Sequence, residues 1–238
     1  EIVMIDNMTT QRYSSLFDLP TNGLYTFVEG DILTLDLDSL FSEADAVIHL
    51  AAITDATSSF NNQEKVQHNN YTTSLRVSES CVTSNVNMFL ISSTSVYGTQ
   101  EKQVDENCRC EDLKPQSPYA ETKLKEEALI KNKIEKEGLR AVILRLGTIF
   151  GTSPGMRFHT AVNKFCWQAV MDQPLTIWKT AFDQKRPYLD LVDAIRVIAF
   201  FLKKNNFDGR VYNVVTLNST VREMVDIIRD FIPELNTE

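Results

Sequence analysis

The chain has 238 residues, and its 32 acidic and 24 basic side chains leave a formal net charge of −8. The length suits one large domain, or one domain with a small lobe, and a hydrophobic content of 43% excludes a disordered or collagen-like chain. The acidic balance disfavours binding to nucleic acid, because phosphates attract clustered Lys and Arg, so we expect a small-molecule substrate.

Short, continuous apolar runs rich in Val and Ile recur along the chain. Such runs are typical of strands that are buried on both faces of a parallel sheet. We therefore predict strands at residues 2–5, 25–28, 46–50, 88–91, 141–144 and 211–215.

Between these runs, apolar residues have the spacing of helices. One such segment ends at Gly138, and another follows the capping-box pattern formed by Thr220 and Glu223. Strands that alternate with helices predict an α/β fold with a parallel sheet and right-handed crossovers. From about residue 150 to 185 the pattern becomes irregular, and we expect this stretch to help build a small lobe over the carboxyl edge of the sheet.

The cysteines and the apolar runs indicate whether disulfides, a metal site or a membrane helix are to be expected. The four cysteines are too few and too scattered for a disulfide framework, and the close pair Cys108 and Cys110 has no nearby histidine to complete a zinc site. We expect no metal and a reducing, cytoplasmic compartment. No run approaches the ~18 apolar residues of a membrane helix, so we expect no membrane partner.

Two strand ends carry residues suited to a cofactor. In a dinucleotide-binding unit, an acid such as Asp6 at a strand end accepts hydrogen bonds from the adenosine ribose. Small residues such as Ala51 and Ala52 allow a flat cofactor to approach the backbone. Each feature also has a plain alternative, namely an acid that caps a loop and tight packing of strand against helix. His49, within an apolar run, is more simply a buried core histidine.

The sharpest chemical signal combines a hydroxyl-rich strand end at Ser93 with Tyr119 and Lys123 about 25 residues later. A Tyr and a Lys four residues apart share one face of a helix. A phenol with a pKa near 10 is a poor base, but an adjacent ammonium and a positively charged nicotinamide would stabilise its phenolate. The hydroxyl of Ser93 could then hold the substrate oxygen. A surface helix with Tyr packed under Lys is the alternative.

Eight motifs, in order along nearly the whole chain, resemble those of the extended short-chain dehydrogenase/reductase family. Within that family, the chain is similar to the NAD-dependent nucleotide-sugar epimerase/dehydratase branch and, in particular, to the UDP-glucose 4-epimerases. The motifs are Ile5-Asp6-Asn7, Gly30-Asp31-Ile32, His49-Leu50-Ala51-Ala52, Asn70, the run from Ser92 to Gly98, Tyr119 with Lys123, Leu144-Arg145 before Gly151, and the run from Arg186 to Asp193. The resemblance implies a Rossmann-like doubly wound parallel sheet with a small C-terminal substrate lobe.

The resemblance also implies the roles of particular residues. Tyr119 would be the general base and acid, Lys123 would lower its pKa and hold the nicotinamide ribose, and Ser93 would bind the reacting sugar oxygen. The implied cofactor is NAD, because the acid at Asp6 would repel the additional phosphate of NADP. The further implied cofactor contacts are Asn7, Asp31, Ile32, Leu50, Ala51, Ala52, Asn70 and Ser92.

The implied substrate contacts are Thr94, Ser95, Thr148 and Arg186. The Arg186 guanidinium would bind the nucleotide diphosphate, unless it forms a surface salt bridge with Asp190 or Asp193. Thr148 departs from the family, because the epimerases usually present Asn at this position.

Thr94 and Ser95 stand where the 4,6-dehydratases have an Asp-Glu pair, and the Glu of the decarboxylating relatives is also missing. A redox cycle at one carbon, as in a 4-epimerase, therefore fits best. An NAD(P)-dependent sugar reductase or dehydrogenase of the same fold and a non-catalytic dinucleotide-binding regulatory subunit are the alternatives.

Three expectations concern organisation. Residues 1–149 would form an N-terminally incomplete dinucleotide-binding core, and residues 150–238 mainly a substrate lobe, with 186–215 returning to the core sheet. Relatives suggest a homodimer through helices around 66–84 and 119–137. None of the 8 glycines forms the family's Gly-x-x-Gly-x-x-Gly turn, so we expect residues 1–238 alone to bind NAD poorly.

Overall fold

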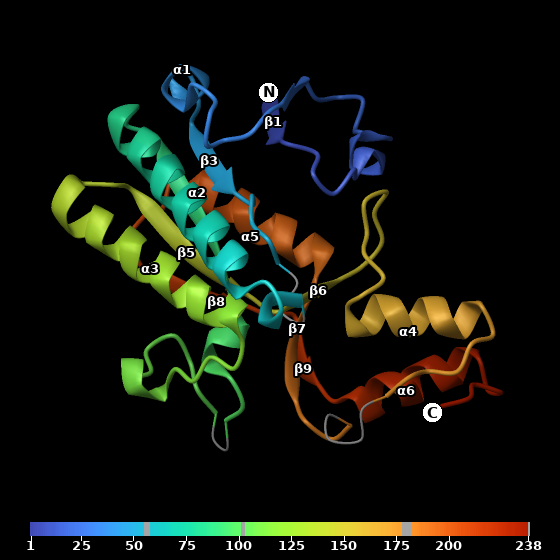
Figure 1. Cartoon of the computed structure of the whole chain (residues 1–238). Coiled ribbons are helices and arrows are strands. Elements are labelled where there is room, and N and C mark those ends of the chain that lie inside the picture. Colours follow the sequence, from blue (N-terminus) through green and yellow to red (C-terminus); the bar gives the residue numbers. More distant parts are fainter. Residues whose placement is uncertain (55–57, 101–102, 178–181, 238) are drawn as a thin grey trace. The chain divides into compact units, whose positions relative to one another are not determined.

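Figure 1 shows the computed structural model of the chain, which describes residues 1–54, 58–100, 103–177 and 182–237. The chain divides into two compact units. The first comprises Glu1–Gln11, Leu19–Leu146 and Ile198–Asn213, and the second comprises Arg12–Asp18, Gly147–Val197 and Val214–Glu238.

The first unit contains the main sheet. Its four strands, in spatial order, are β3 (Ala46–His49), β4 (Asn87–Ser93), β5 (Ala141–Leu146) and β8 (Val211–Val214). β4 pairs in parallel with both β3 and β5. A separate parallel pair joins β1 (Ile2–Asp6) to β2 (Tyr25–Glu29). Each predicted apolar run therefore forms a strand, and the predicted α/β fold with a parallel sheet is confirmed.

Helices lie on both faces of the main sheet (Figure 1). The helices α2 (Gln63–Thr83) and α3 (Pro118–Glu137) pack side by side on one face. On the opposite face lies the C-terminal half of α5 (Leu191–Lys204), where the Phe201 ring meets the Phe89 ring of β4 at 6.4 Å between centroids. The short α1 (Leu37–Phe41) packs beside α2.

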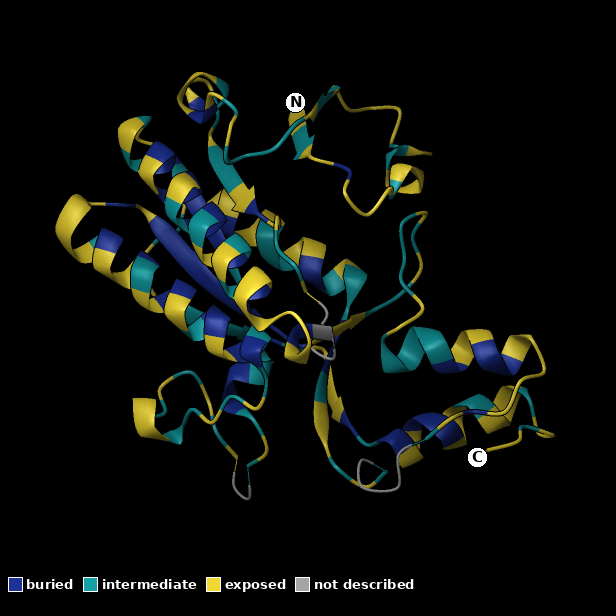
Figure 2. Ribbon diagram, in the orientation of Figure 1, coloured by how far each residue is buried: buried dark blue, intermediate teal, exposed yellow. Residues whose placement is uncertain are grey.

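The core lies between the sheet and the pair α2 and α3. β5 is buried along its whole length, as Figure 2 shows. Met88, Leu90 and Ile143 of the sheet pack with Val77 of α2 and Ile130 of α3, and all five are almost fully buried. Burying one such aliphatic side chain stabilises the fold by about 1.5–3 kcal/mol, so this layer fixes α3 against β4 and β5.

The sequence sets both ends of α3. The hydroxyl oxygen of Ser117 accepts a hydrogen bond from the Ala120 amide at 3.2 Å, and Pro118 occupies the first turn. Gly138 ends the helix with φ 73°, as predicted from its position. These ends place Tyr119 in the first turn of α3.

The second unit has a three-stranded sheet in the order β6 (Thr148–Phe150), β7 (Arg186–Asp190) and β9 (Leu217–Ser219). β7 is parallel to β6 and antiparallel to β9. Of residues 186–215, only β8 therefore belongs to the main sheet. A small core joins α4 (Ala161–Val170) to α6 (Val221–Phe231), which begins at the predicted capping box of Thr220 and Glu223.

In the described part of the chain, the remaining elements are short 3₁₀ helices at Tyr13–Leu16, Ser58–Phe60, Thr94–Tyr97 and Cys110–Asp112. The four cysteines are unpaired. Among the residues described, no helix has the length and apolar character to cross a membrane, and no group of three or more His, Cys, Asp or Glu side chains could hold a metal ion.

Candidate active site

The carboxyl end of β4 presents Ser93. The Ser93 hydroxyl oxygen accepts a hydrogen bond from the Ser95 amide at 3.2 Å and so caps the 3₁₀ turn Thr94–Tyr97. Gly98 ends this turn with φ 63°, and a Cβ there would collide with the Lys114 carbonyl. The Ser93 hydroxyl is thus held by its oxygen, while its proton stays available for donation.

Tyr119 and Lys123 lie one turn apart at the start of α3. Tyr119 is half-buried and Lys123 is 3% exposed. The Lys123 ammonium lies 5.9 Å from the centroid of the Tyr119 ring. The two groups therefore share one face of the helix, in the arrangement that a Lys-stabilised phenolate requires.

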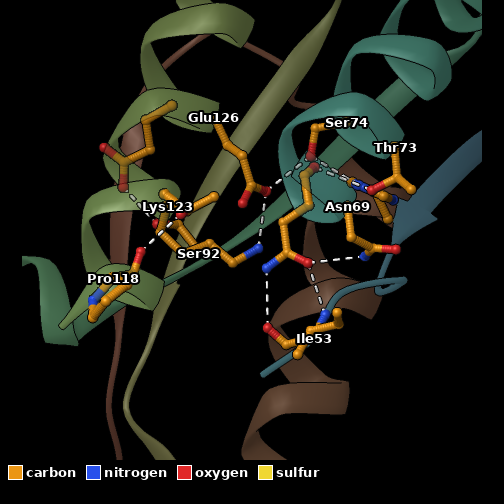
Figure 3. A network of polar contacts seen from close by, with 12 residues as sticks. Ile53, Asn69, Thr73, Ser74, Ser92, Pro118, Lys123 and Glu126 are labelled. Atoms are coloured by element: carbon orange, nitrogen blue, oxygen red, sulfur yellow. Dashed lines mark hydrogen bonds and ion pairs between the residues drawn. The ribbon is translucent and has the colours of Figure 1, made fainter. Parts of the chain in front are cut away.

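Lys123 belongs to a buried chain of polar contacts, shown in Figure 3. Lys123 Nζ donates to Glu126 Oε2 at 3.0 Å, and Ser74 Oγ of α2 donates to the same oxygen at 2.8 Å. His49 Nε2, at the end of β3, lies 2.9 Å from Ser74 Oγ. Because the only proton of Ser74 Oγ goes to Glu126, this oxygen accepts the hydrogen bond from His49, which places a proton on Nε2.

His49 is neutral near pH 7. Burial, together with the charge of Lys123, lowers the pKa of His49 to about 3. The histidine is therefore a buried, hydrogen-bonded core residue, as the sequence indicated.

A second buried network lies on the neighbouring side of α3. Arg145 of β5 donates through Nε and Nη2 to the two carboxylate oxygens of Glu127, at 2.9 and 2.7 Å, and through Nη1 to Tyr97 Oη at 2.9 Å. Ser92 Oγ also donates to Glu127 Oε1, at 2.6 Å. Burial works against the charge of Arg145, but the hydrogen bonds that Arg145 donates to Glu127 and Tyr97, with the charge of Glu127, outweigh it and raise the pKa of the guanidinium.

Glu126 and Glu127 were not predicted from the sequence. A signal did exist for Glu127, because Arg145 lies within an apolar strand, and a guanidinium buried there requires a buried counter-charge. The partner itself, 18 residues earlier on a helix, could not be identified without the fold.

Two predicted cofactor-binding acids lie in turns at strand ends. Asp6 ends β1, is exposed, and accepts a hydrogen bond from the Met8 amide at 2.7 Å. Asn7 Oδ1 caps the next turn by accepting from the Thr9 amide at 3.2 Å. Asp31 Oδ1 accepts from the Leu33 amide at 2.9 Å. Both acids use one carboxylate oxygen, Oδ1, in these turns.

Other predicted cofactor contacts have structural partners. Asn70 of α2 is fully buried and fastens the loop after β3, because its side chain accepts from the Ile53 amide at 2.8 Å and donates to the Ile53 carbonyl at 3.0 Å (Figure 3). Ser92 is buried against Glu127, and Ile32 packs against the main core. In contrast, Leu50 in the loop after β3 is 64% exposed. Ala51 beside it is exposed and Ala52 is half-buried.

The predicted substrate contacts divide between the units. Thr94 and Ser95 follow Ser93 in the first unit, where Thr94 Oγ1 donates to the Leu146 carbonyl at 3.2 Å. Thr148 and Arg186 are exposed residues of the second unit.

Arg186 donates to Gln184 Oε1 at 2.8 Å, whereas Asp193 pairs with Arg196 at 2.9 Å. Within the described ranges, no ion pair joins Arg186 to Asp190 or Asp193, so the alternative of a surface salt bridge finds no support.

Comparisons with known proteins agree with this geometry. Residues 1–214 match the model of the NAD dependent epimerase/dehydratase family. The chain is 33% identical over 224 residues to YtcB of Bacillus subtilis, an uncharacterized UDP-glucose epimerase, and the match covers 92% of this chain and 68% of YtcB. It is 30% identical over 212 residues to a trifunctional UDP-glucose 4,6-dehydratase, epimerase and reductase of Arabidopsis thaliana, covering 87% of this chain but only 31% of that protein.

Among solved structures, UDP-glucuronic acid 4-epimerase from Bacillus cereus, in complex with UDP-glucuronic acid and NAD, superposes with a TM-score of 0.89 at 27% identity. The match covers 100% of this chain and 76% of that one. These findings confirm the resemblance drawn from the eight motifs, the Rossmann-like fold and the expectation of an NAD-dependent enzyme. The chain therefore belongs to the NAD dependent epimerase/dehydratase family.

Proposed function

We propose that this protein interconverts a UDP-hexose at C4, with NAD as cofactor and Tyr119 as the base and acid. The observation that carries the proposal is the end of β4, where Ser93 is followed by Thr94 and Ser95. No carboxylate follows directly after the hydroxyl that would hold the sugar. A proton transfer at a single oxygen needs only the phenol, whereas proton transfer at a neighbouring carbon would need a further acid–base group.

The donor set of the first unit fits NAD. Asp6 is exposed at a strand end and would accept hydrogen bonds from the adenosine ribose. The exposed loop at Leu50 and Ala51 leaves its backbone open to a flat ring. Lys123 Nζ has three donor protons, of which Glu126 takes one, so the others would be available to the nicotinamide ribose. NAD would supply the redox chemistry by taking a hydride from C4 and returning it.

The remaining proposed cofactor residues divide into direct contacts and supporting residues. Asn7, Asp31, Ile32 and Ala52 would contact the cofactor, while Asn70 and Ser92 would support it by holding the loop at Ile53 and the carboxylate of Glu127. These last two side chains are buried and already bonded within the protein.

The chain's own residues would move one proton. The Tyr119 phenolate would take the proton of the 4-hydroxyl at its Oη atom and return it to the same sugar oxygen after the 4-keto sugar has turned over. Lys123 would stabilise the phenolate, and the Ser93 hydroxyl would hold the sugar oxygen by donating its proton. The cycle is redox-neutral.

The substrate class draws support from the relatives. The UDP group is proposed because the relatives at 33% and 27% identity are named for UDP-glucose and UDP-glucuronic acid. In the second unit, Arg186 carries an exposed guanidinium suited to a diphosphate, and Thr148 would contact the sugar. Residues 1–149 would thus serve the cofactor, and residues 150–238 mainly the substrate.

A C4-resolved assay tests the proposal. The protein in its full natural length, with NAD, is incubated with UDP-glucose or UDP-glucuronic acid, and the C4 epimer is followed by proton NMR. We expect interconversion without net NADH, and a loss of at least ~100-fold in Tyr119→Phe, because the proton acceptor is removed. Tyr71→Phe, the same change at a more exposed tyrosine of α2, should retain activity. No interconversion of either sugar would refute the proposal, and stoichiometric NADH would favour the reductase or dehydrogenase alternative.

A cytoplasmic homodimer belongs to the same proposal. Its support is the resemblance to relatives that dimerise through two helices, which correspond here to α2 and α3. Light scattering that gave the mass of a single chain would contradict the dimer.

A further inference from the structure

Glu126 is an unusual neighbour for Lys123. The carboxylate and the ammonium are three residues apart on α3, and their side chains are 0% and 4% exposed. Both donors that reach Glu126, Lys123 Nζ and Ser74 Oγ, converge on Oε2. Oε1 is buried and has no hydrogen-bond partner among the described residues.

This arrangement is costly if Glu126 serves packing alone. A buried carboxylate oxygen without a partner loses its hydration and gains nothing in return, whereas an apolar side chain of similar size avoids that loss. The bonds that Oε2 accepts from Lys123 and Ser74 offset part of this cost, but packing alone does not explain the buried Oε1, which has no partner among the described residues. What the carboxylate does supply is a negative charge 3.0 Å from the ammonium that faces Tyr119.

A charge at that place opposes the effect of Lys123 on the phenol. Lys123 stabilises a Tyr119 phenolate through its positive charge, and a carboxylate bonded to the same ammonium cancels part of that field. Burial makes the cancellation larger than it would be in water, because the local dielectric is low.

We propose that Glu126 is a positioning residue that holds Lys123 and sets the pH at which Tyr119 loses its proton. This inference rests on the proposed function of Tyr119 as the base. Glu126 touches neither the sugar nor the cofactor in this role and acts only through Lys123.

The groups around Glu126 come from three elements. On α3 they are Lys123 and the carboxylate of Glu127, and on α2 the hydroxyl of Ser74, which also contacts the neutral ring of His49 at the end of β3. Burial raises the pKa of the Glu126 carboxyl, and Glu127 adds to this effect, while Lys123 and Ser74 oppose it. The balance of these groups sets how much negative charge stands beside Lys123.

The test is the pH dependence of epimerisation in Glu126→Gln, which keeps the shape and removes the charge. With the charge of Lys123 unopposed, the phenolate is favoured. The acid limb of the profile, which is the rise in epimerisation rate with pH on its low-pH side, should therefore have its midpoint about 0.5–1 unit lower. Glu135→Gln, the same change on an exposed part of α3, should leave the limb in place. An unmoved limb in Glu126→Gln, or a move to higher pH, overturns the proposal.

Ser74→Ala provides a second variant if Glu126→Gln does not fold. The change removes one donor to Glu126 Oε2, which disfavours the charged carboxylate, so the acid limb should move in the same direction by less. A limb that stays in place in this variant contradicts the proposal as well.

A spectroscopic readout separates this inference from the proposed function. The ultraviolet absorbance of tyrosinate is recorded against pH, and the spectrum of Tyr119→Phe is subtracted to isolate Tyr119. We expect the Tyr119 transition at lower pH in Glu126→Gln than in the natural protein, whether or not any UDP-sugar is converted. Identical transitions would refute the role of Glu126, while absent conversion with a shifted transition would refute only the epimerase proposal.

Discussion

Glu126 and Glu127 are neighbours on α3 and both are buried, yet they serve different networks. Glu127 accepts hydrogen bonds at both oxygens, from Arg145 and Ser92. Glu126 accepts both of its bonds at one oxygen. Successive helix residues point about 100° apart, so one carboxylate faces the sheet and the other faces α2.

The difference separates an ion pair that stabilises the fold from an ion pair that adjusts the charge beside Tyr119. The Arg145–Glu127 pair is bidentate and joins the helix to β5, so it holds α3 in register with the strand that ends near the site. The Lys123–Glu126 pair lies within one helix and joins no new element by itself. Its geometry bears on the charge beside Tyr119 and less on the fold. Variants on each side can test this division.

The largest effect on stability is expected from Glu127→Ala. Removing one partner of a buried pair leaves the Arg145 charge without compensation, which should lower the free energy of unfolding by about 3–5 kcal/mol. Urea unfolding of the protein measures this loss. Glu135→Ala, on an exposed part of the same helix, should change it by about 0.5 kcal/mol or less. A loss that did not exceed that of the control would show that the pair is not structural.

His49→Gln tests how acid changes the stability of the fold through the polar network that contains Glu126. The pKa of His49 is about 3 in the folded chain against a reference value of 6.5, so the unfolded chain binds a proton there that the folded chain excludes. The associated stability is present above pH 6.5 and is lost as the pH falls toward 3. At pH 5 the loss is about 2 kcal/mol.

Urea unfolding at pH 7 and at pH 5 measures this loss. His49→Gln keeps a side-chain donor for Ser74 but does not titrate, so the natural protein should lose about 2 kcal/mol more than the variant between these conditions. The raised pKa of Glu126 acts in the opposite sense and is common to both proteins. Equal losses in the two proteins would mean that His49 is accessible to protons in the folded state.

The comparison also shows what the sequence could reveal. The main strands were predictable because continuous apolar runs such as that of β5 can be satisfied only by burial on both faces. Tyr119 and Lys123 were predictable because a spacing of four fixes their common helix face. The three-residue strands β6 and β9 carry too few residues for any periodicity, so their pairing with β7 emerged only from the fold.

The roles of Ser92 and Ser93 show where sequence reasoning ends. Adjacent residues of a strand point to opposite faces, so only one of the two hydroxyls can face the same way as the site. The motif does not say which, and the structure buries Ser92 against Glu127 while Ser93 caps the turn. The role of Asn70 is likewise visible only in the structure, where its buried amide holds the Ile53 backbone, 17 residues away in sequence.

The smallest effect is expected at the last residue of the same helix. Glu137 pairs with Lys133 at 2.9 Å, but its side chain is 43% exposed and lies at the helix C-terminus, where the helix dipole disfavours a negative charge. Glu137→Gln should therefore change the free energy of unfolding by about 0.3–0.5 kcal/mol or less, in urea at low salt. If it cost as much as Glu127→Ala, burial and bidentate geometry would not be what distinguishes the carboxylates of α3.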